Sequence, residues 1–340
     1  MGTWSTSVPA PEFTQPQSNS SSCEIQDGFL AATLPAMYSL IFISSLLSNT
    51  LALWVFWHHT QPNTSITVYM KNLAVSDLLL SLCLPFRTAY QNQSGPLVLC
   101  TMVGAFFYLN MYVSILFLSL ISLDRYLKII WPLQQFKIHT LPCSTAAARV
   151  VWLACAIGTL PFFFERREEV PCANKCFHFR SKRPLGAALN MVVVAAFFLH
   201  LLLFLYFYGK ISATLHKAPL GKVQQQSQRT RSKAITNILV VLIIFTVCFA
   251  PYHSVRVPYI LAQVDVISST QWKQALHLAN ELVLCISALN SCLDPVIFFF
   301  LSSSFRKAVL CTIQGKLKRA LLRNQGAPHH SKSITELGLD

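Results

Sequence analysis

The chain has 340 residues, of which 53% are hydrophobic and only 12% are charged, and its formal net charge is +14 at pH 7. This charged share is about half that of soluble proteins, so most side chains are expected to face lipid rather than water. The positive charge does not indicate a nucleic-acid-binding protein, because the chain has no basic stripe with interleaved aromatic residues. Membrane proteins gain such an excess from lysines and arginines in their cytoplasmic segments.

The first 27 residues are rich in serine, threonine, proline and glutamine, and no positively charged start precedes an apolar core. Residues 1–27 are therefore predicted to form a disordered extracellular tail without a cleaved signal peptide. Asn19 begins an Asn-Ser-Ser glycosylation pattern in this tail, and Asn92 begins an Asn-Gln-Ser pattern in a short outer loop. Four cysteines flank the apolar segments and are disulfide candidates in an oxidising compartment, namely Cys23, Cys100, Cys172 and Cys176.

Seven apolar segments follow the tail, and each is long enough to cross a hydrocarbon core, which takes about 20 residues. They lie at 30–57, 67–90, 99–130, 145–164, 186–215, 234–261 and 273–301. The sequence therefore predicts an all-α membrane protein with a seven-transmembrane helix bundle over residues 28–301. A short amphipathic helix on the membrane surface is predicted at 302–318, and a disordered cytoplasmic tail at 319–340.

Lysines and arginines set the expected orientation. They gather between the fifth and sixth segments and after the seventh, so both regions are placed in the cytoplasm and the N-terminus outside. The loop between the fourth and fifth segments is also basic and would be extracellular. It is either a vestibule that attracts an anionic ligand or simply a solvated loop face.

Several polar residues lie deep inside these apolar segments, where ionisable groups are costly and usually functional. Two carboxylates and several neutral oxygens could together coordinate a sodium ion with water. The alternative is a hydrogen-bonded polar network with one protonated aspartate. The residues concerned are Asp77, Asn110, Ser114, Asn290 and Asp294.

The third segment ends in Asp124-Arg125-Tyr126. An acid beside an arginine at the end of an apolar helix is costly unless both are paired or hydrated. One interpretation is a switch in which Asp124 holds Arg125 at rest and a partner that docks from inside releases it. The other is an arginine that extends to the membrane edge.

The sixth segment carries Pro251, which removes one backbone hydrogen bond and predicts a hinge. His253 and Arg256 are three residues apart and share one helix face above this hinge. Pro85 in the second segment is expected to turn Arg87 toward the same mouth of the bundle. The three side chains are interpreted as an anion clamp, unless His253 is merely hydrogen-bonded in place.

These features resemble class A (rhodopsin-like) G-protein-coupled receptors over about residues 28–315. The triplet stands at the inner end of the third of seven segments, and Asp294-Pro295-x-x-Phe298 matches a family signature in which Phe298 replaces a tyrosine. Leu84-Pro85-Phe86-Arg87 and the run from Cys248 to His253 resemble the purinergic-like branch. Cys176-Phe177-His178 and Asn280-Glu281 are most similar to its lysophosphatidylserine-recognising part.

The resemblance implies three sets of residues. It implies a disulfide between Cys100 and Cys176, and an allosteric sodium ion but no other cofactor. In this branch the N-terminal cysteine pairs with one in the third outer loop, which has no cysteine here, so Cys23 either pairs with Cys172 instead or stays free. It implies an activation switch of Asp124, Arg125, Tyr126, Tyr208, Phe245, Phe249, Pro251, Pro295 and Phe298. It implies a ligand site of Arg87, Tyr90, Phe107, Tyr108, Met111, Arg180, His253, Arg256, Asn280 and Glu281.

The resemblance also implies a plasma-membrane receptor rather than an enzyme. It would pass the binding of an extracellular anionic ligand, such as lysophosphatidylserine, to heterotrimeric G proteins of the inhibitory type. In this interpretation Glu281 meets a head-group ammonium, while Arg87 and Arg256 take the phosphate or carboxylate. Arrestin, receptor kinases and membrane lipid are further expected partners, and no nucleic acid is expected.

Three alternatives remain open at this point. The first is a nucleotide or nucleotide-sugar receptor of the same branch, although such receptors usually carry a lysine where Asn280 stands. The second is a seven-helix transporter or channel, which would need a continuous polar path. The third is a non-signalling decoy receptor, suggested by Phe298 and opposed by the intact Asp124-Arg125-Tyr126 triplet.

Overall fold

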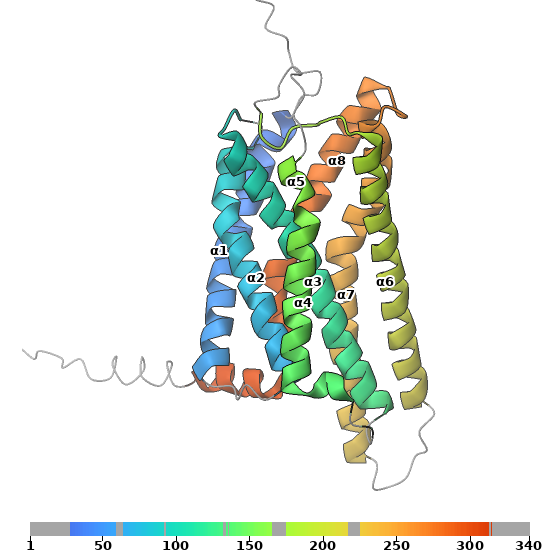
Figure 1. Cartoon of the computed structure of the whole chain (residues 1–340). Coiled ribbons are helices and arrows are strands. Elements are labelled where there is room, and N and C mark those ends of the chain that lie inside the picture. The colour runs from blue at the N-terminus through green and yellow to red at the C-terminus, as the bar shows by residue number, and fades with distance from the viewer. Residues whose placement is uncertain are drawn as a thin grey trace, which may run out of the picture.

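The computed structural model of the chain describes residues 28–58, 64–91, 93–131, 134, 136–164, 175–216, 225–312 and 314. Figure 1 shows these residues as a bundle of long helices that run side by side. Among them, seven helical stretches are long and apolar enough to cross a membrane. The predicted all-α membrane fold with seven spans is confirmed.

The bounds of the spans differ by several residues from the expected ones, because hydropathy alone does not determine the residue at which a helix begins or ends. In chain order the helices are α1 (Gly28–His58), α2 (Ser65–Ala89), α3 (Leu97–Ile130), the 3-10 helix η1 (Lys137–His139), α4 (Leu141–Thr159), α5 (Pro161–Phe164), α6 (Pro184–His216), α7 (Gln225–Gln263), α8 (Thr270–Ala288) and α9 (Asn290–Leu301). Residues 303–312 are also helical.

The seventh span is two helices rather than one, because the chain turns at Leu289 between α8 and α9. Four residues after Ser291 stands Pro295, which has no backbone N–H to donate to the Ser291 carbonyl. The side chain of Asn49 supplies the missing donor from α1, with 2.8 Å between Nδ2 and the carbonyl oxygen. A side chain of the first span thus completes the backbone hydrogen bonding of the last.

The fifth and sixth spans are unbroken helices. α6 continues through His200, whose Nδ1 lies 3.1 Å from the Ala196 carbonyl oxygen. α7 continues through Pro251 and also through Pro258. Each proline leaves the carbonyl four residues earlier without its helical donor, which weakens the helix at Val247 and again at Ser254.

Large side chains fill the interior of the bundle, and large apolar side chains also cover its outside. The biggest fully buried ones include Tyr38, Phe56 and Phe245. By contrast, Leu40 on α1 and Leu185 on α6 are 70% and 73% exposed. Helices that are apolar on both the packed and the outward face are expected in lipid, where the outward face is not in contact with water.

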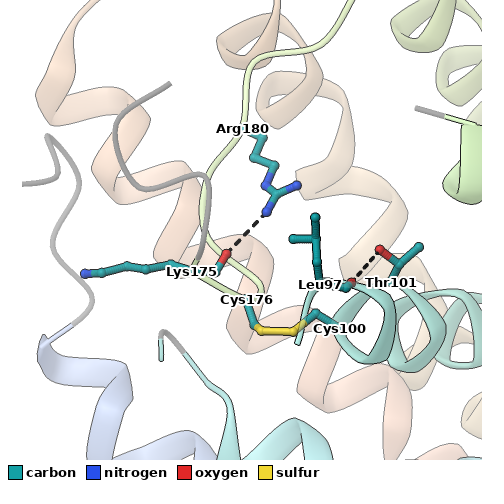
Figure 2. Close-up of a disulfide and its surroundings, with 6 residues drawn as sticks. All are labelled: Leu97, Cys100, Thr101, Lys175, Cys176 and Arg180. Atoms are coloured by element: carbon teal, nitrogen blue, oxygen red, sulfur yellow. Dashed lines mark hydrogen bonds between the residues drawn. A yellow bond between two sulfur atoms is a disulfide. The ribbon is translucent and has the colours of Figure 1, made fainter. Parts of the chain in front are cut away.

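A disulfide closes one end of the bundle, which we call the disulfide end. Cys100 near the start of α3 is bonded to Cys176, as Figure 2 shows. The Cα atoms of the two residues are 5.6 Å apart. The backbone N–H of Cys176 donates to the Gln93 carbonyl at 3.0 Å. Gly95 is required beside it, because a Cβ there would lie 2.5 Å from Tyr90 Cδ1 and 3.0 Å from Cys176 Sγ. The predicted bond between Cys100 and Cys176 is confirmed.

The opposite end of the bundle carries Asp124-Arg125-Tyr126 and is called the triplet end. The helix at 303–312 lies across this end in Figure 1, and Phe305 is buried there against Phe56, with 4.9 Å between ring centroids. The amphipathic helix expected at 302–318 is thus described as helix up to residue 312. Several predictions concern positions outside the described residues, namely the two tails, Asn19, Asn92, Cys23 and Cys172.

Candidate functional site

Arg87 lies in the last turn of α2 and forms a buried ion pair with Glu281 of α8; the side chains are 4% and 6% exposed. Gln91 Nε2 donates to the same carboxylate oxygen at 3.3 Å. The guanidinium carbon lies 3.8 Å from the centroid of the Phe177 ring, which covers it from the disulfide-linked loop. Arg87 and Glu281 therefore neutralise each other, a pairing that the sequence did not predict.

Arg256 is the second buried guanidinium of this end, and it has a different surrounding. Its Nη1 and Nη2 donate at 3.2 Å to the amide oxygens of Asn280 and Asn190. The rings of Tyr252 and Tyr259 lie beside it, at 5.8 and 5.2 Å from their centroids. It forms no ion pair within the described residues, so none of the described acids compensates its positive charge.

Two neighbouring residues of α8 connect these arginines. Asn280 contacts Arg256, while Glu281 contacts Arg87. Because adjacent helix residues point about 100° apart, one short stretch of α8 can serve α7 and α2 at once. The two arginines are thus brought to one region, as predicted, but with distinct electrostatic states.

His253 does not join this pair of arginines. Its Nδ1 lies 2.8 Å from the Phe249 carbonyl oxygen, and its ring stacks on Phe197 at 3.7 Å between centroids and 8° between planes. No hydrogen bond links it to Arg256 in the described part of the chain. Its surroundings match the simpler interpretation of a histidine that is hydrogen-bonded in place.

The remaining predicted ligand residues lie toward the same end, with different contacts. Phe107 and Met111 are buried, and Tyr108 stacks on Phe162 at 5.0 Å. Tyr90 caps α2 beside Gly95. Arg180 Nη2 donates to the Lys175 carbonyl at 3.3 Å, which directs this guanidinium to the loop backbone, as Figure 2 shows.

The predicted sodium residues meet in the middle of the bundle. Asn110 Nδ2 donates to Asp77 Oδ1 at 3.1 Å, and Asn290 Nδ2 donates to Asp294 Oδ2 at 2.9 Å. Four buried oxygens have no hydrogen-bond partner in the described structure: Asp77 Oδ2, Ser114 Oγ, Asn290 Oδ1 and Asp294 Oδ1. An all-oxygen set of this kind fits a hard cation.

At the triplet end, Asp124 and Arg125 do not form the expected pair. Asp124 accepts hydrogen bonds from Ser65, Lys128 and His139. Arg125 Nη2 donates instead to the Leu301 carbonyl at 2.8 Å. This carbonyl is at the last residue of α9, where helix carbonyls lack intrahelical donors. The acid and the arginine thus each have partners other than one another.

The other switch residues are packed rather than hydrogen-bonded. Phe245 contacts the rings of Phe249 and Phe204, at 5.4 and 4.5 Å between centroids. Phe298, three residues after Pro295, packs against Phe56 at 5.5 Å, so its ring occupies an apolar site. Tyr126 stacks on Phe207 at 4.6 Å, and the neighbouring Tyr208 of α6 is half-buried.

Sequence reasoning missed the residues that complete these contacts. Asn190 stands in the first two turns of α6, where nothing in the local pattern marks it as a partner of Arg256. Phe177 was a detectable candidate, since it follows the disulfide cysteine. His139 lies in a short loop helix, and its contact with Asp124 has no signature in the sequence.

Comparison with known proteins adds an independent finding. Residues 48–298 match the family described as 7 transmembrane receptor (rhodopsin family). The chain is 38% identical over 325 residues to the probable G-protein coupled receptor 34 of Pan troglodytes, covering 94% of this chain and 83% of that protein. It is 34% identical over 291 residues to the G-protein coupled receptor 87 of Mus musculus, covering 83% and 80%. It is also 34% identical over 286 residues to the purinoceptor 14 of Bos taurus, covering 82% and 84%.

The family match reaches from the second half of the first span into the last span, and the relatives align over 82–94% of the chain. The family consists of multi-pass membrane receptors rather than enzymes, which leaves the transporter alternative without support. The chain therefore belongs to the rhodopsin-like (class A) family of G-protein-coupled receptors, in its purinergic-like branch.

Proposed function

We propose that this receptor binds an extracellular anionic lysophospholipid, such as lysophosphatidylserine, at its disulfide end and activates inhibitory heterotrimeric G proteins at its triplet end. The N-terminus then lies outside the plasma membrane, as the lysines and arginines indicate. Arrestin and receptor kinases are the further partners that this function requires. The ligand signals by binding the G-protein-competent state of the bundle more tightly than the resting state.

One observation carries the choice of ligand, and it is the charge of the two arginine sites. Arg87 is neutralised by Glu281, whereas Arg256 is buried without an acidic partner in the described residues. A buried guanidinium with donors to spare prefers an anion such as a phosphate. The site therefore offers one net positive charge, which suits a phosphodiester with a single negative charge.

The pair of Arg87 and Glu281 supports a zwitterionic head group beside that phosphodiester. A serine head group carries an ammonium and a carboxylate, so it offers the opposite charge to each member of the pair. A lipid with a plain phosphate has no ammonium for Glu281. Lysophosphatidylserine thus complements both arginine sites, while lysophosphatidic acid complements only one.

A nucleotide remains the second candidate, favoured by the similarity to proteins named as purinoceptors. A nucleotide diphosphate carries about three negative charges and needs several cations around it. The amide of Asn280 occupies a position beside Arg256 where a lysine would add such a cation. The nucleotide alternative therefore predicts that Asn280→Lys improves a response that is already present.

The test is a dose-response measurement of nucleotide exchange on purified inhibitory and stimulatory G proteins, with the receptor in lipid nanodiscs. Lysophosphatidylserine, lysophosphatidic acid, ADP and UDP-glucose are compared. Arg256→Gln should reduce the potency of lysophosphatidylserine by at least about 30-fold, since a charge-assisted contact contributes about 2 kcal/mol. Lys273→Gln is the matched control, because its partner Asp265 is an exposed residue at the same end.

An unchanged potency in Arg256→Gln would refute the site. A response to ADP or UDP-glucose but not to the lipids would support the nucleotide alternative. Exchange on stimulatory G proteins only would correct the coupling without affecting the ligand assignment.

A further inference from the structure

The carboxylate of Asp124 is fully buried and accepts hydrogen bonds from three different elements. Ser65 at the start of α2 donates to Oδ1 at 2.5 Å, and Lys128 of α3 donates to Oδ2 at 2.9 Å. His139 of η1 places its Nδ1 2.7 Å from Oδ1. Buried carboxylates require such donors, because desolvation of the charge is otherwise very costly.

His139 contributes the only contact from the loop between α3 and α4 to this carboxylate in the described residues. An ionised carboxylate can only accept hydrogen bonds, so Nδ1 of His139 must carry the proton. The loop geometry holds the ring in place, because the His139 backbone N–H donates to the Phe136 carbonyl at 3.0 Å. The ring of Phe136 also meets the His139 ring edge-on, at 6.0 Å.

The three donors differ in how strongly they can satisfy the acid. Lys128 is 38% exposed, so water screens its attraction to Asp124. Ser65 is neutral, and its one hydroxyl proton is already donated to Asp124. His139 is only 17% exposed and donates from a second direction, so its hydrogen bond is better shielded than that of the lysine.

Because Asp124 already accepts three hydrogen bonds, Arg125 contacts other groups. Arg125 Nη2 donates to the Leu301 carbonyl at 2.8 Å, and its Nε has no hydrogen-bond partner in the described structure. If Asp124 lost a donor, its charge would be less compensated. Lys128 is already bound, so the adjacent guanidinium of Arg125, which interacts electrostatically with Asp124, is the cation that could move to it. A pair of Asp124 and Arg125 would then form at the expense of the contact with α9.

We infer that His139 is a positioning residue that keeps Asp124 from pairing with Arg125 and so raises the ligand-independent activity of this receptor. The two arrangements of Arg125, on Leu301 or on Asp124, are the two states of an equilibrium, and His139 favours the first. The inference rests on the proposed coupling to a G protein at the triplet end, where Arg125 must be available. It does not depend on which ligand the receptor binds.

The experiment measures basal nucleotide exchange on a purified inhibitory G protein by receptor in nanodiscs, without ligand and per mole of folded receptor. His139→Phe keeps an aromatic ring and removes the donor, whereas His139→Asn keeps a donor near the position of Nδ1. Lys137→Gln alters an exposed side chain of the same short helix and serves as the control. Asp124→Asn, alone and combined with His139→Phe, tests whether the effect acts through the acid.

His139→Phe should lower the basal rate by about tenfold, the change expected when a shielded hydrogen bond to a charged group is lost. His139→Asn should remain within about twofold of the unmodified receptor, and Lys137→Gln should not change the rate. The effect of His139→Phe should disappear in the Asp124→Asn background. A merely structural role would instead lower the yield of folded receptor and would not be rescued by asparagine.

Equal or higher basal exchange in His139→Phe would overturn the inference, as would an equal loss in the phenylalanine and asparagine variants. Persistence of the effect without the Asp124 charge would also overturn it. An unmodified receptor that promotes exchange on no G protein, with or without lysophosphatidylserine, would count against the proposed coupling and this inference together. A basal exchange rate that is the same with and without the His139 substitutions would count against the inference alone.

Discussion

The buried pair of Arg87 and Glu281 permits a quantitative prediction about stability. Removing one member of a buried ion pair leaves an uncompensated charge and costs about 3–5 kcal/mol, while replacing both members is often nearly neutral. Arg87→Gln and Glu281→Gln should therefore each lower the free energy of unfolding strongly. The double variant should lose less than the two single losses added together. The expected coupling free energy is about 3 kcal/mol.

The structure also predicts which single variant is worse. Glu281→Gln leaves the Arg87 guanidinium 3.8 Å from the Phe177 ring centroid, a contact worth about 2 kcal/mol when desolvated. Arg87→Gln removes that contact and leaves the Glu281 carboxylate with the amide of Gln91 at 3.3 Å. The arginine variant should therefore lie at the upper end of the range and the glutamate variant at the lower end.

The assay is thermal unfolding of the purified receptor, followed by a thiol-reactive fluorophore that detects buried cysteines such as Cys248 and Cys285 as they become exposed. The matched control is the pair of Lys273 and Asp265, in which the carboxylate side chain is 73% exposed. Its coupling should be below about 1 kcal/mol. Additive effects of the two buried substitutions, or a coupling equal to that of the control pair, would refute the reasoning.

Four further outcomes are expected. Gly95→Ala should lower the unfolding midpoint by the equivalent of about 1–3 kcal/mol, because the new Cβ would lie 2.5 Å from the Tyr90 ring; an unchanged midpoint would contradict the geometry. Cys176→Ser should cost about 4 kcal/mol in the same assay, since the lost bond spans 76 residues of sequence. His253→Phe should leave the potency of lysophosphatidylserine within about threefold of that on the unmodified receptor. A larger loss would show that His253 is part of the ligand site. Asp77→Asn should make lysophosphatidylserine potency insensitive to replacing sodium chloride by choline chloride. An unmodified receptor that is already insensitive to this replacement would contradict the sodium site.

Much of the fold could be predicted because lipid imposes simple rules on a chain. Length and hydropathy define each span, and Pro85 and Pro251 stand inside helices as expected. The division of the seventh span at Leu289 was less visible, since the segment from 273 to 301 is apolar enough on average to be taken as one span. The hydrogen bond from Asn49 that accompanies it is a contact between residues 242 positions apart.

The candidate site shows where sequence reasoning stops. Arg87 and Arg256 were identified by type and position, but the sequence could not show that Glu281 pairs with Arg87 rather than with a ligand. One of the three partners of Asp124 could have been found, because Lys128 stands one turn further on the same helix face. Contacts that depend on loops, such as that of His139, required the structure itself.

The hydrogen bond from Asn49 to Ser291 has a mechanical consequence. It ties the first helix to the segment that follows the Leu289 turn, so any displacement of that segment either carries α1 with it or breaks the bond. α1 holds none of the predicted ligand or switch residues, yet its position reports on the last span. A fluorescent label on α1 would therefore register activation from a site that touches neither the ligand nor the G protein.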